Sequence, residues 1–228
     1  MRRMVAASQN TDPRTGRLLL GIVGIGLAIQ LFVRYWGQSS ELQVDGFYWA
    51  TAIARIAVPA LAIALLGLRF DGFGLGIPRI PRREGLWLLG AAAVSIVIVW
   101  IALQSEDYRA AYQGARYGDF GTKLTRWTLF TLSTTVPWEI LHRGFLLHGI
   151  RHVLVRAKLP ESSADAIAIG FVTCFEVLYH LIKPVLEAGA LLVGSPILSY
   201  LAFRYRSLWL PLVIHVAIEG LWFAAVWF

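Results

Sequence analysis

The sequence predicts an all-α, polytopic membrane protein with about seven transmembrane helices and a polar site between the later helices. Hydrophobic residues make up 57% of the 228 residues and charged residues only 15%, whereas a soluble domain is nearer half apolar and a quarter charged. The mean hydropathy is +0.61. Nine Trp and eight Tyr residues, many of them near the ends of apolar stretches, are typical of aromatic belts at a membrane surface. We therefore expect the lipid bilayer to surround most of the chain.

Seven apolar stretches separated by polar loops are expected to form these helices, since a transmembrane helix needs about 20 apolar residues. The fourth contains Pro137, where we expect a bend. The sixth is short, at roughly fifteen residues. We expect Lys183 and Pro184, just before it, to break the helix and line a wet cavity. The expected stretches are 18–35, 47–68, 86–104, 124–149, 164–182, 188–203 and 208–228.

The net charge of +7 arises largely in short loops beside apolar stretches, where Lys and Arg set orientation and contact anionic headgroups. We therefore expect no nucleic-acid partner. Most loop Lys and Arg residues fall on one side if the N-terminal tail, residues 1–17, is cytoplasmic. This positive-inside pattern predicts a multi-pass protein of the cell membrane with a cytoplasmic N-terminus. Cys174, the single cysteine, is expected to be a packed core residue.

Ionisable residues within the apolar stretches are candidates for function, because each costs about 2.5 to 3.5 kcal/mol on insertion scales. Six of them form three pairs spaced four residues apart, so each pair projects from one face of its own helix. Lipid cannot satisfy such faces, and we expect the three helices to bury them together. The pairs are Glu139 with Arg143, Glu176 with His180, and His215 with Glu219.

Each pair also has a structural explanation. The first can be an intrahelical ion pair, the third can be a packing hydrogen bond, and His180 can lie at the interface. Arg55, inside the second stretch, can snorkel or pair with a glutamate. A purely structural bundle has little need for three carboxylates and two imidazoles at membrane depth. Together the pairs therefore favour a functional polar cavity.

These side chains suit the hydrolysis of a peptide bond. Glu139, or failing it Glu176, can take a proton from water. His180 and His215 can position that water or stabilise a developing oxyanion, while Arg143 can orient Glu139. The two histidines and one or two carboxylates could instead hold zinc with a water in the open position. The sequence leaves this alternative open, and we favour a site without a metal cofactor.

The stretch WEILHRGFLL, from Trp138 to Leu147, resembles the first motif of the CAAX-protease and bacteriocin-processing (CPBP) family of intramembrane proteases, E-E-x-x-x-R followed by G-F. His180 resembles the histidine of the family's F-x-x-x-H motif, and His215 that of its H-x-x-x-N motif. The resemblance covers roughly residues 124–222. It implies a membrane-embedded endopeptidase and a membrane-anchored peptide or protein substrate, such as a prenylated tail, a leader peptide or a C-terminal sorting helix.

Three positions depart from the family pattern. Trp138 stands where the family has its first glutamate, which is usually assigned as the base, and Glu176 stands at the phenylalanine position. Glu219 replaces the final asparagine. The combination W-E-x-x-x-R-G-F with H-x-x-K-P-x-x-E, which runs from His180 to Glu187, resembles a side branch of the family. The identity of the base, Glu139 or Glu176, is therefore open.

The leading hypothesis is an intramembrane endopeptidase that uses glutamate-activated water, with Trp138 and Glu187 as substrate contacts. We expect the N-terminal transmembrane helices at 18–123 and the catalytic core at 124–228. The alternative is a catalytically inactive relative that binds transmembrane segments as a chaperone or immunity factor, because Trp138 replaces a glutamate. A proton-coupled carrier is disfavoured, since the sequence shows no inverted repeat.

Overall fold

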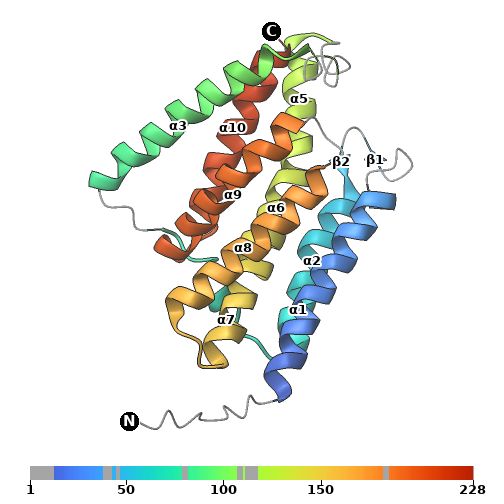
Figure 1. The fold of residues 1–228 in the computed structure, drawn as a ribbon. Coiled ribbons are helices and arrows are strands. Elements are labelled where there is room, and N and C mark those ends of the chain that lie inside the picture. The colour runs from blue at the N-terminus through green and yellow to red at the C-terminus, as the bar shows by residue number, and fades with distance from the viewer. Residues whose placement is uncertain are drawn as a thin grey trace.

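The computed structural model describes residues 13–37, 43–44, 47–78, 82–106, 110, 118–181 and 185–227. Seven helical rods make up nearly all of this part of the chain (Figure 1), and the predicted all-α fold class is confirmed. A pair of two-residue strands was not predicted. The rods and strands are α1 (Pro13–Phe32) with η1 (Val33–Gly37), β1 (Gln43–Val44), β2 (Phe47–Tyr48), α2 (Trp49–Leu65), α3 (Arg82–Leu103), a composite rod from α5 to α7, α8 (Glu161–His180), α9 (Val185–Tyr205) and α10 (Trp209–Trp227).

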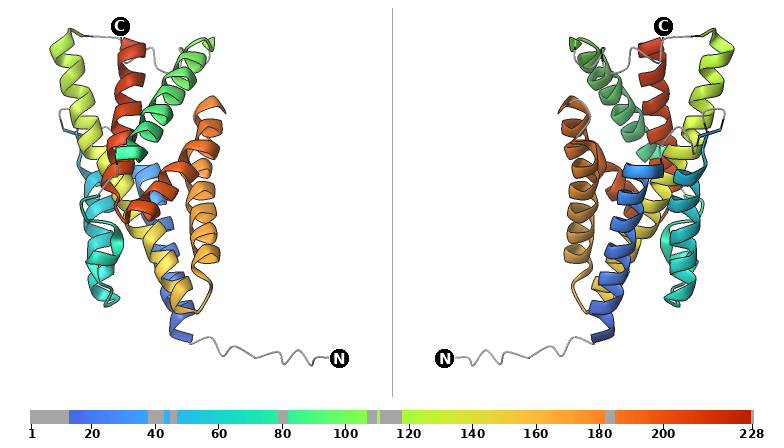
Figure 2. Two further views of the ribbon diagram at one scale, coloured as in Figure 1. Left: turned by 90° about the vertical axis from the view of Figure 1, so that its left-hand side faces the viewer. Right: turned by 90° about the vertical axis from the view of Figure 1, so that its right-hand side faces the viewer.

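The helices have the length and composition of membrane spans. Among the described residues, Pro13–Gly37, Glu161–His180 and Val185–Tyr205 are long and apolar enough to cross a bilayer, and α2, α3 and α10 contain shorter apolar helices. Large apolar side chains such as Leu20, Leu61 and Val213 point outward from the bundle, where only lipid could cover them. The chain is a polytopic membrane protein. The start of α1 and the end of α10 lie at opposite ends of the bundle (Figure 2), as an odd number of spans requires.

Two sequence predictions about the later helices were wrong. The sixth helix is not short, because α9 begins at Val185 and has 21 residues. Cys174 is exposed on α8, so it faces the lipid side and not the core. The predicted break at Lys183 and Pro184 lies outside the described residues.

The composite rod carries the Thr134–Gly149 stretch and is built from alternating α and π turns. It comprises α5 (Phe120–Phe130), η5 (Thr131–Thr135), α6 (Val136–Glu139), η6 (Ile140–Leu147) and α7 (His148–Arg156). Asp119 caps its start by accepting a hydrogen bond from the backbone N–H of Thr122 at 2.7 Å, and this bond lowers the pKa of the exposed carboxyl below its usual value. Pro137 lies inside the rod, between the two π segments. Wide π turns are frequent at functional sites, and here η6 begins directly after Glu139 and contains Arg143.

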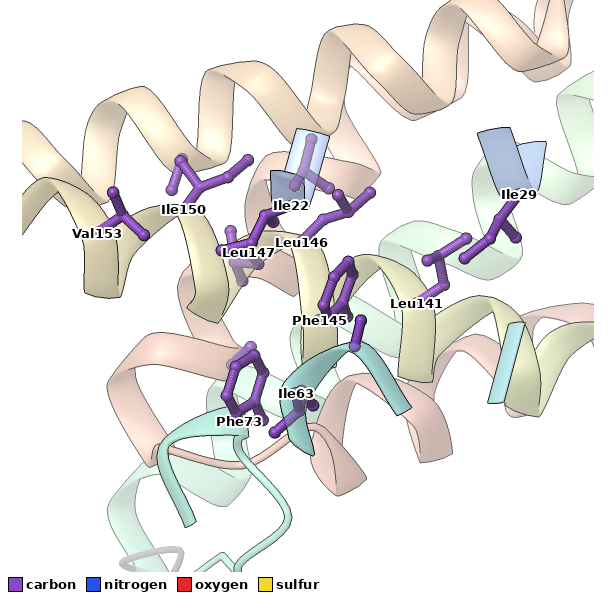
Figure 3. Close-up of a cluster of buried hydrophobic side chains, with 14 of the residues drawn as sticks. Ile22, Ile29, Ile63, Phe73, Leu141, Phe145, Leu146, Leu147, Ile150 and Val153 are labelled. Carbon is purple, nitrogen blue, oxygen red and sulfur yellow. The ribbon is translucent and has the colours of Figure 1, made fainter. Parts of the chain in front are cut away.

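The hydrophobic core surrounds the lower half of this rod. Ile22 and Ile29 of α1, Ile63 of α2, and Phe145 and Leu146 of η6 are among the buried residues that meet there (Figure 3). Gly26 allows α1 to approach closely, because a Cβ atom at this position would lie 2.5 Å from Cδ2 of Leu146. The composite rod is therefore fixed against α1 and α2 on one side, and it packs against α8 on another (Figure 1).

The segment after α2 ties the first half of the chain to the second. It forms η3 (Phe70–Phe73) and ends at Gly74 in the left-handed conformation, with φ 74°. The backbone N–H of Leu208 donates to the Gly74 carbonyl at 2.7 Å, and Ser207 Oγ donates to the Gly76 carbonyl at 2.6 Å. A Cβ atom on Gly74 would lie 2.7 Å from Nε2 of the buried His148. Both backbone angle and space therefore require glycine here.

We predict that Gly74→Ala destabilises the protein by about 1–3 kcal/mol, because alanine would be strained at this φ and would contact His148. Gly72→Ala is the matched control, since nothing lies within 4 Å of the added Cβ. Thermal unfolding of the detergent-solubilised variants measures the difference. Equal midpoints for the two variants would show that the contact at Gly74 does not constrain the fold.

Candidate active site

Arg143 lies at the centre of the buried polar residues and joins two carboxylates from different helices. Its Nη1 atom is 3.1 Å from Oε1 of Glu139, four residues earlier in the same rod. Nη1 and Nη2 both bond Glu176 of α8, with Nη2 at 2.9 Å from Oε2. Nη2 is also 3.4 Å from Oγ of Ser195 on α9. Because the arginine and both glutamates are buried, these bonds hold the rod, α8 and α9 together at one point.

Trp138 adds a second donor to Glu176. Its indole Nε1–H donates to Oε1 of Glu176 at 2.8 Å, so both oxygens of that carboxylate are occupied by donors. The donors come from Trp138 and Arg143 of the composite rod, so Glu176 ties α8 to that rod. Trp138, which replaces the family's first glutamate, thus contacts the carboxylate that α8 contributes.

Glu139 pairs with the imidazole of α10. His215 Nδ1 lies 2.6 Å from Glu139 Oε1, and His215 Nε2 lies 3.7 Å from Glu219 Oε1. Thr135 donates its hydroxyl to the other oxygen of Glu219. The second oxygen of Glu139, Oε2, is buried and has no hydrogen-bond partner among the described residues. His215 is therefore held between two carboxylates, one fully buried and one partly exposed.

His180 of α8, like His215 of α10, lies close to a carboxylate of another residue. Its Nδ1–H donates to the backbone carbonyl of Glu176 at 2.9 Å, and its Nε2 is 3.8 Å from Oε1 of Glu187 on α9. Its ring also meets the Trp138 ring edge-on, with centroids 5.1 Å apart. The predicted residue pairs thus converge in part: Glu139, Arg143, Glu176 and His215 form one connected cluster, while His180 and Glu187 form an adjacent contact.

A cavity of about 400 Å³ opens beside these residues, between α3, α8, α9 and α10. Its polar wall includes seven of the eight residues predicted for the site, whereas Glu139 lies behind His215 and does not line it. The rest of the lining is mostly apolar, with Val94 and Ile98 from α3, Leu191 and Leu198 from α9, and Ile214 and Ile218 from α10. The polar residues on the wall are Trp138, Arg143, Glu176, His180, Glu187, His215 and Glu219.

The site does not contain an evident metal centre. Within the described parts of the chain, no group of three His, Cys, Asp or Glu side chains lies close enough to hold an ion. His215 contacts Glu139 and Glu219 through its two different ring nitrogens, whereas catalytic zinc sites use three protein ligands on one ion. The choice between a site with zinc and a site without a metal stays a prediction.

Sequence reasoning missed several residues that contact the site. Gln30, His142 and Arg55 form a buried hydrogen-bonded group behind Trp138. Arg55 neither snorkels nor forms an ion pair with a glutamate within the described residues. Gln30 is a strongly polar side chain in the interior of its apolar stretch, whereas Arg34 lies near the end of that stretch; this interior position is a signal that could have identified Gln30. Ser195 gives no such signal, because serine is common in transmembrane helices at packing positions.

The fold and the site define a polytopic α-helical membrane protein with a buried carboxylate, imidazole and arginine cluster beside an apolar cavity. Residues 121–221 match the family model described as type II CAAX prenyl endopeptidase Rce1-like. The match confirms the predicted resemblance to the CPBP family over this region. No curated protein and no solved structure gives a significant match. The proposed side-branch pattern and the division at residue 123 stay predictions.

We predict that Arg143→Met destabilises the protein by about 3–5 kcal/mol, because it leaves two buried carboxylates without their shared cation. Arg151→Met is the control. Arg151 also bonds two carboxylates, those of Glu161 and Asp165, but at a partly exposed position where such pairs contribute at most about 1 kcal/mol. Thermal unfolding in detergent compares the two variants, and equal losses would contradict the central role of Arg143.

Proposed function

We propose that the protein is an intramembrane endopeptidase in which the Glu139–His215 pair activates the attacking water. The match to the family model supports a membrane endopeptidase fold. The observation that carries the proposal is the 2.6 Å bond between Glu139 Oε1 and His215 Nδ1, located directly behind the wall of an apolar cavity. A carboxylate that accepts from Nδ1–H fixes the histidine tautomer and supports the imidazolium that forms during catalysis.

This tautomer directs the lone pair of His215 Nε2 toward the cavity side. A water can lie within hydrogen-bond reach of both Nε2 and Glu219 Oε1, because these two atoms are 3.7 Å apart. His215 then takes the proton of the water as it attacks the peptide carbonyl, and Glu139 stabilises the resulting positive charge. Glu139 thus acts through the imidazole and not by direct contact with the water.

Glu139 is preferred over Glu176 as the activating carboxylate. Both oxygens of Glu176 are engaged by Trp138 and Arg143, whereas Glu139 Oε2 has no partner among the described residues. The role we propose for Glu176 is therefore to hold Arg143 in place. Arg143 in turn keeps Glu139 beside His215.

His180 supplies the second imidazole. Its Nδ1–H is engaged by the Glu176 carbonyl, and its Nε2 lies 3.8 Å from Oε1 of Glu187, another residue that lines the cavity. In its protonated form the ring donates from Nε2 to the tetrahedral oxyanion or to the leaving nitrogen. We propose that Trp138 and Glu187, which also line the cavity, contact the substrate.

The proposed substrate is a membrane-anchored peptide or protein cleaved close to an apolar segment. Support comes from the cavity, whose walls on α3, α9 and α10 are mainly Val, Ile and Leu. An extended peptide with apolar side chains can lie against these walls while its scissile bond meets the polar wall. Hydrolysis is proposed to proceed without a resident metal, since His215 contacts Glu139 and Glu219 through its two different ring nitrogens.

We predict that His215→Ala and Glu139→Gln each lower kcat/KM by about 10²–10⁴-fold, the usual contribution of general-base catalysis. The matched controls are His152→Ala and Glu161→Gln, both at exposed positions. The purified protein in lipid nanodiscs is incubated with membranes from cells that lack it, and mass spectrometry identifies new peptide N-termini.

Two outcomes would redirect this proposal. If wild-type protein yields no N-termini that are missing with His215→Ala, the endopeptidase function fails, and crosslinking to intact transmembrane segments tests the non-catalytic alternative. If a chelator removes activity and zinc restores it, the metal-free mechanism fails.

We also propose that the N-terminal end of α1 faces the cytoplasm. Arg14 and Arg17 of α1 and Arg151 and Arg156 of α7 lie at the same end of the bundle (Figure 1), and such Lys and Arg clusters favour the cytoplasmic side.

To test the orientation, Cys174 is first replaced by Ser. A single new cysteine is then introduced, as Arg156→Cys in one variant and Lys123→Cys in another, because these two positions lie at opposite ends of the composite rod. We predict that a membrane-impermeant maleimide added to intact cells labels the Lys123→Cys variant and spares the Arg156→Cys variant. Lysed cells, in which both should react, provide the control. The reverse labelling pattern would invert the orientation.

A further inference from the structure

A buried polar chain lies behind Trp138, on the side of α1 and α2. Arg55 Nη2 donates to Oε1 of Gln30 at 2.8 Å. Gln30 Nε2 lies 2.9 Å from Nε2 of His142, and His142 Nδ1 lies 2.8 Å from the backbone carbonyl of Trp138. All of these side chains are buried, and neither Arg55 nor Gln30 falls within the matched residues 121–221.

The hydrogen bonds of this chain all run in one direction. A carbonyl can only accept, so His142 Nδ1 carries the proton and its Nε2 is an acceptor. Gln30 must then donate its amide N–H to His142 and accept from Arg55 through its carbonyl oxygen. Each group has one consistent role, which makes the chain a directional connection from the Arg55 cation to the backbone of Trp138.

Arg55 and His142 also hold the indole ring of Trp138. Arg55 Cζ lies 4.7 Å from the centre of the Trp138 ring, within the range of a cation–π interaction. The His142 ring stacks on the indole with centroids 4.0 Å apart and an interplanar angle of 27°. The held indole donates its N–H to Glu176. Arg55 is therefore linked to Glu176 through Trp138, by both the ring and the backbone.

We infer that Arg55 is a positioning residue that fixes Glu176 through the Trp138 indole. Glu139 and Glu176 both bond Nη1 of Arg143. If the indole released Glu176, Arg143 could turn its donor fork toward Glu139, four residues away on its own rod. Glu139 Oε1 would then be drawn away from His215. Holding Glu176 on Arg143 thus preserves the Glu139–His215 pair.

The burial of Arg55 supports a positioning role over a purely structural one. A buried guanidinium without a carboxylate partner is costly, and an apolar side chain of similar size would usually pack at least as stably. What the guanidinium adds is orientation, because its planar charge lies over the Trp138 and Tyr179 rings and its N–H bonds the Gln30 amide. The catalytic meaning of this arrangement rests on the proposed function, whereas the link from Arg55 to Trp138 and Glu176 does not.

The test uses protein with ¹⁵N-labelled tryptophan in detergent micelles, and the indole signal of Trp138 is assigned as the one lost in Trp138→Phe. In wild type this N–H bonds a carboxylate, so its proton resonance should lie downfield and exchange slowly with D₂O. We predict that Arg55→Met shifts the signal upfield and speeds its exchange, as Glu176→Gln also should. Arg55→Lys, which keeps the cation, should restore part of the wild-type position.

Arg151→Met is the matched control. Arg151 also lies over an aromatic ring, with its Cζ atom 5.5 Å from the centre of the Phe203 ring, but it does not contact Trp138. The inference is overturned if Arg55→Met leaves the Trp138 signal unchanged, or if Arg151→Met moves it equally. If Arg55→Met does not fold, Gln30→Met decides the question, since it interrupts the chain without removing a charge. An unchanged Trp138 signal in that variant would overturn the inference.

The proposed function is tested separately from this link. With a cleaved substrate in hand, Arg55→Lys should retain more kcat than Arg55→Met, because the lysine keeps the cation that positions Trp138 and Glu176. If the indole signal shifts as predicted but the protein has no peptidase activity, only the proposed function is contradicted. Normal activity of Arg55→Met with an unshifted indole would contradict the positioning role alone.

Discussion

The site depends on the sharing of Arg143 between Glu139 of its own rod and Glu176 of α8. Lipid offers no substitute for a lost partner, so this bond network fixes the contact between the rod, α8 and α9. The two carboxylates also differ in their contacts. Glu176 bonds both Nη atoms of Arg143, whereas Oε1 of Glu139 is shared between Arg143 and His215 of α10. Four helices therefore meet around one guanidinium, and the apolar cavity lies beside this meeting point.

The departures from the family pattern make physical sense together. Trp138 removes a carboxylate from the composite rod, and Glu176 supplies one from α8 that bonds the same indole. The number of buried carboxylates near Arg143 is thereby kept at two, although one now comes from another helix. Glu219 replaces an asparagine, yet it remains beside His215 and accepts from Thr135. A connected polar site is therefore present despite these departures from the family pattern.

Much of the fold could be predicted from the sequence, because apolar length and loop charge determine where helices cross a bilayer. Spacing by four residues also identified the polar faces of three helices correctly. The inward or outward direction of an apolar residue could not be predicted, since lipid and core are equally apolar, and Cys174 illustrates this. The length of α9 was missed because its first turn contains Glu187 and follows a proline. The link between Gln30, Arg55 and Trp138 depends on tertiary contacts across more than a hundred residues, which spacing does not reveal.

The most direct test of the central claim is the protonation state of the His215 ring, measured by ¹⁵N NMR of histidine-labelled protein near neutral pH. His215→Ala assigns the signals. Our account predicts a proton on Nδ1, directed at Glu139, and an unprotonated Nε2 on the cavity side. A ring protonated on Nε2, alone or together with Nδ1, would contradict the role of the Glu139–His215 pair as the group that activates water.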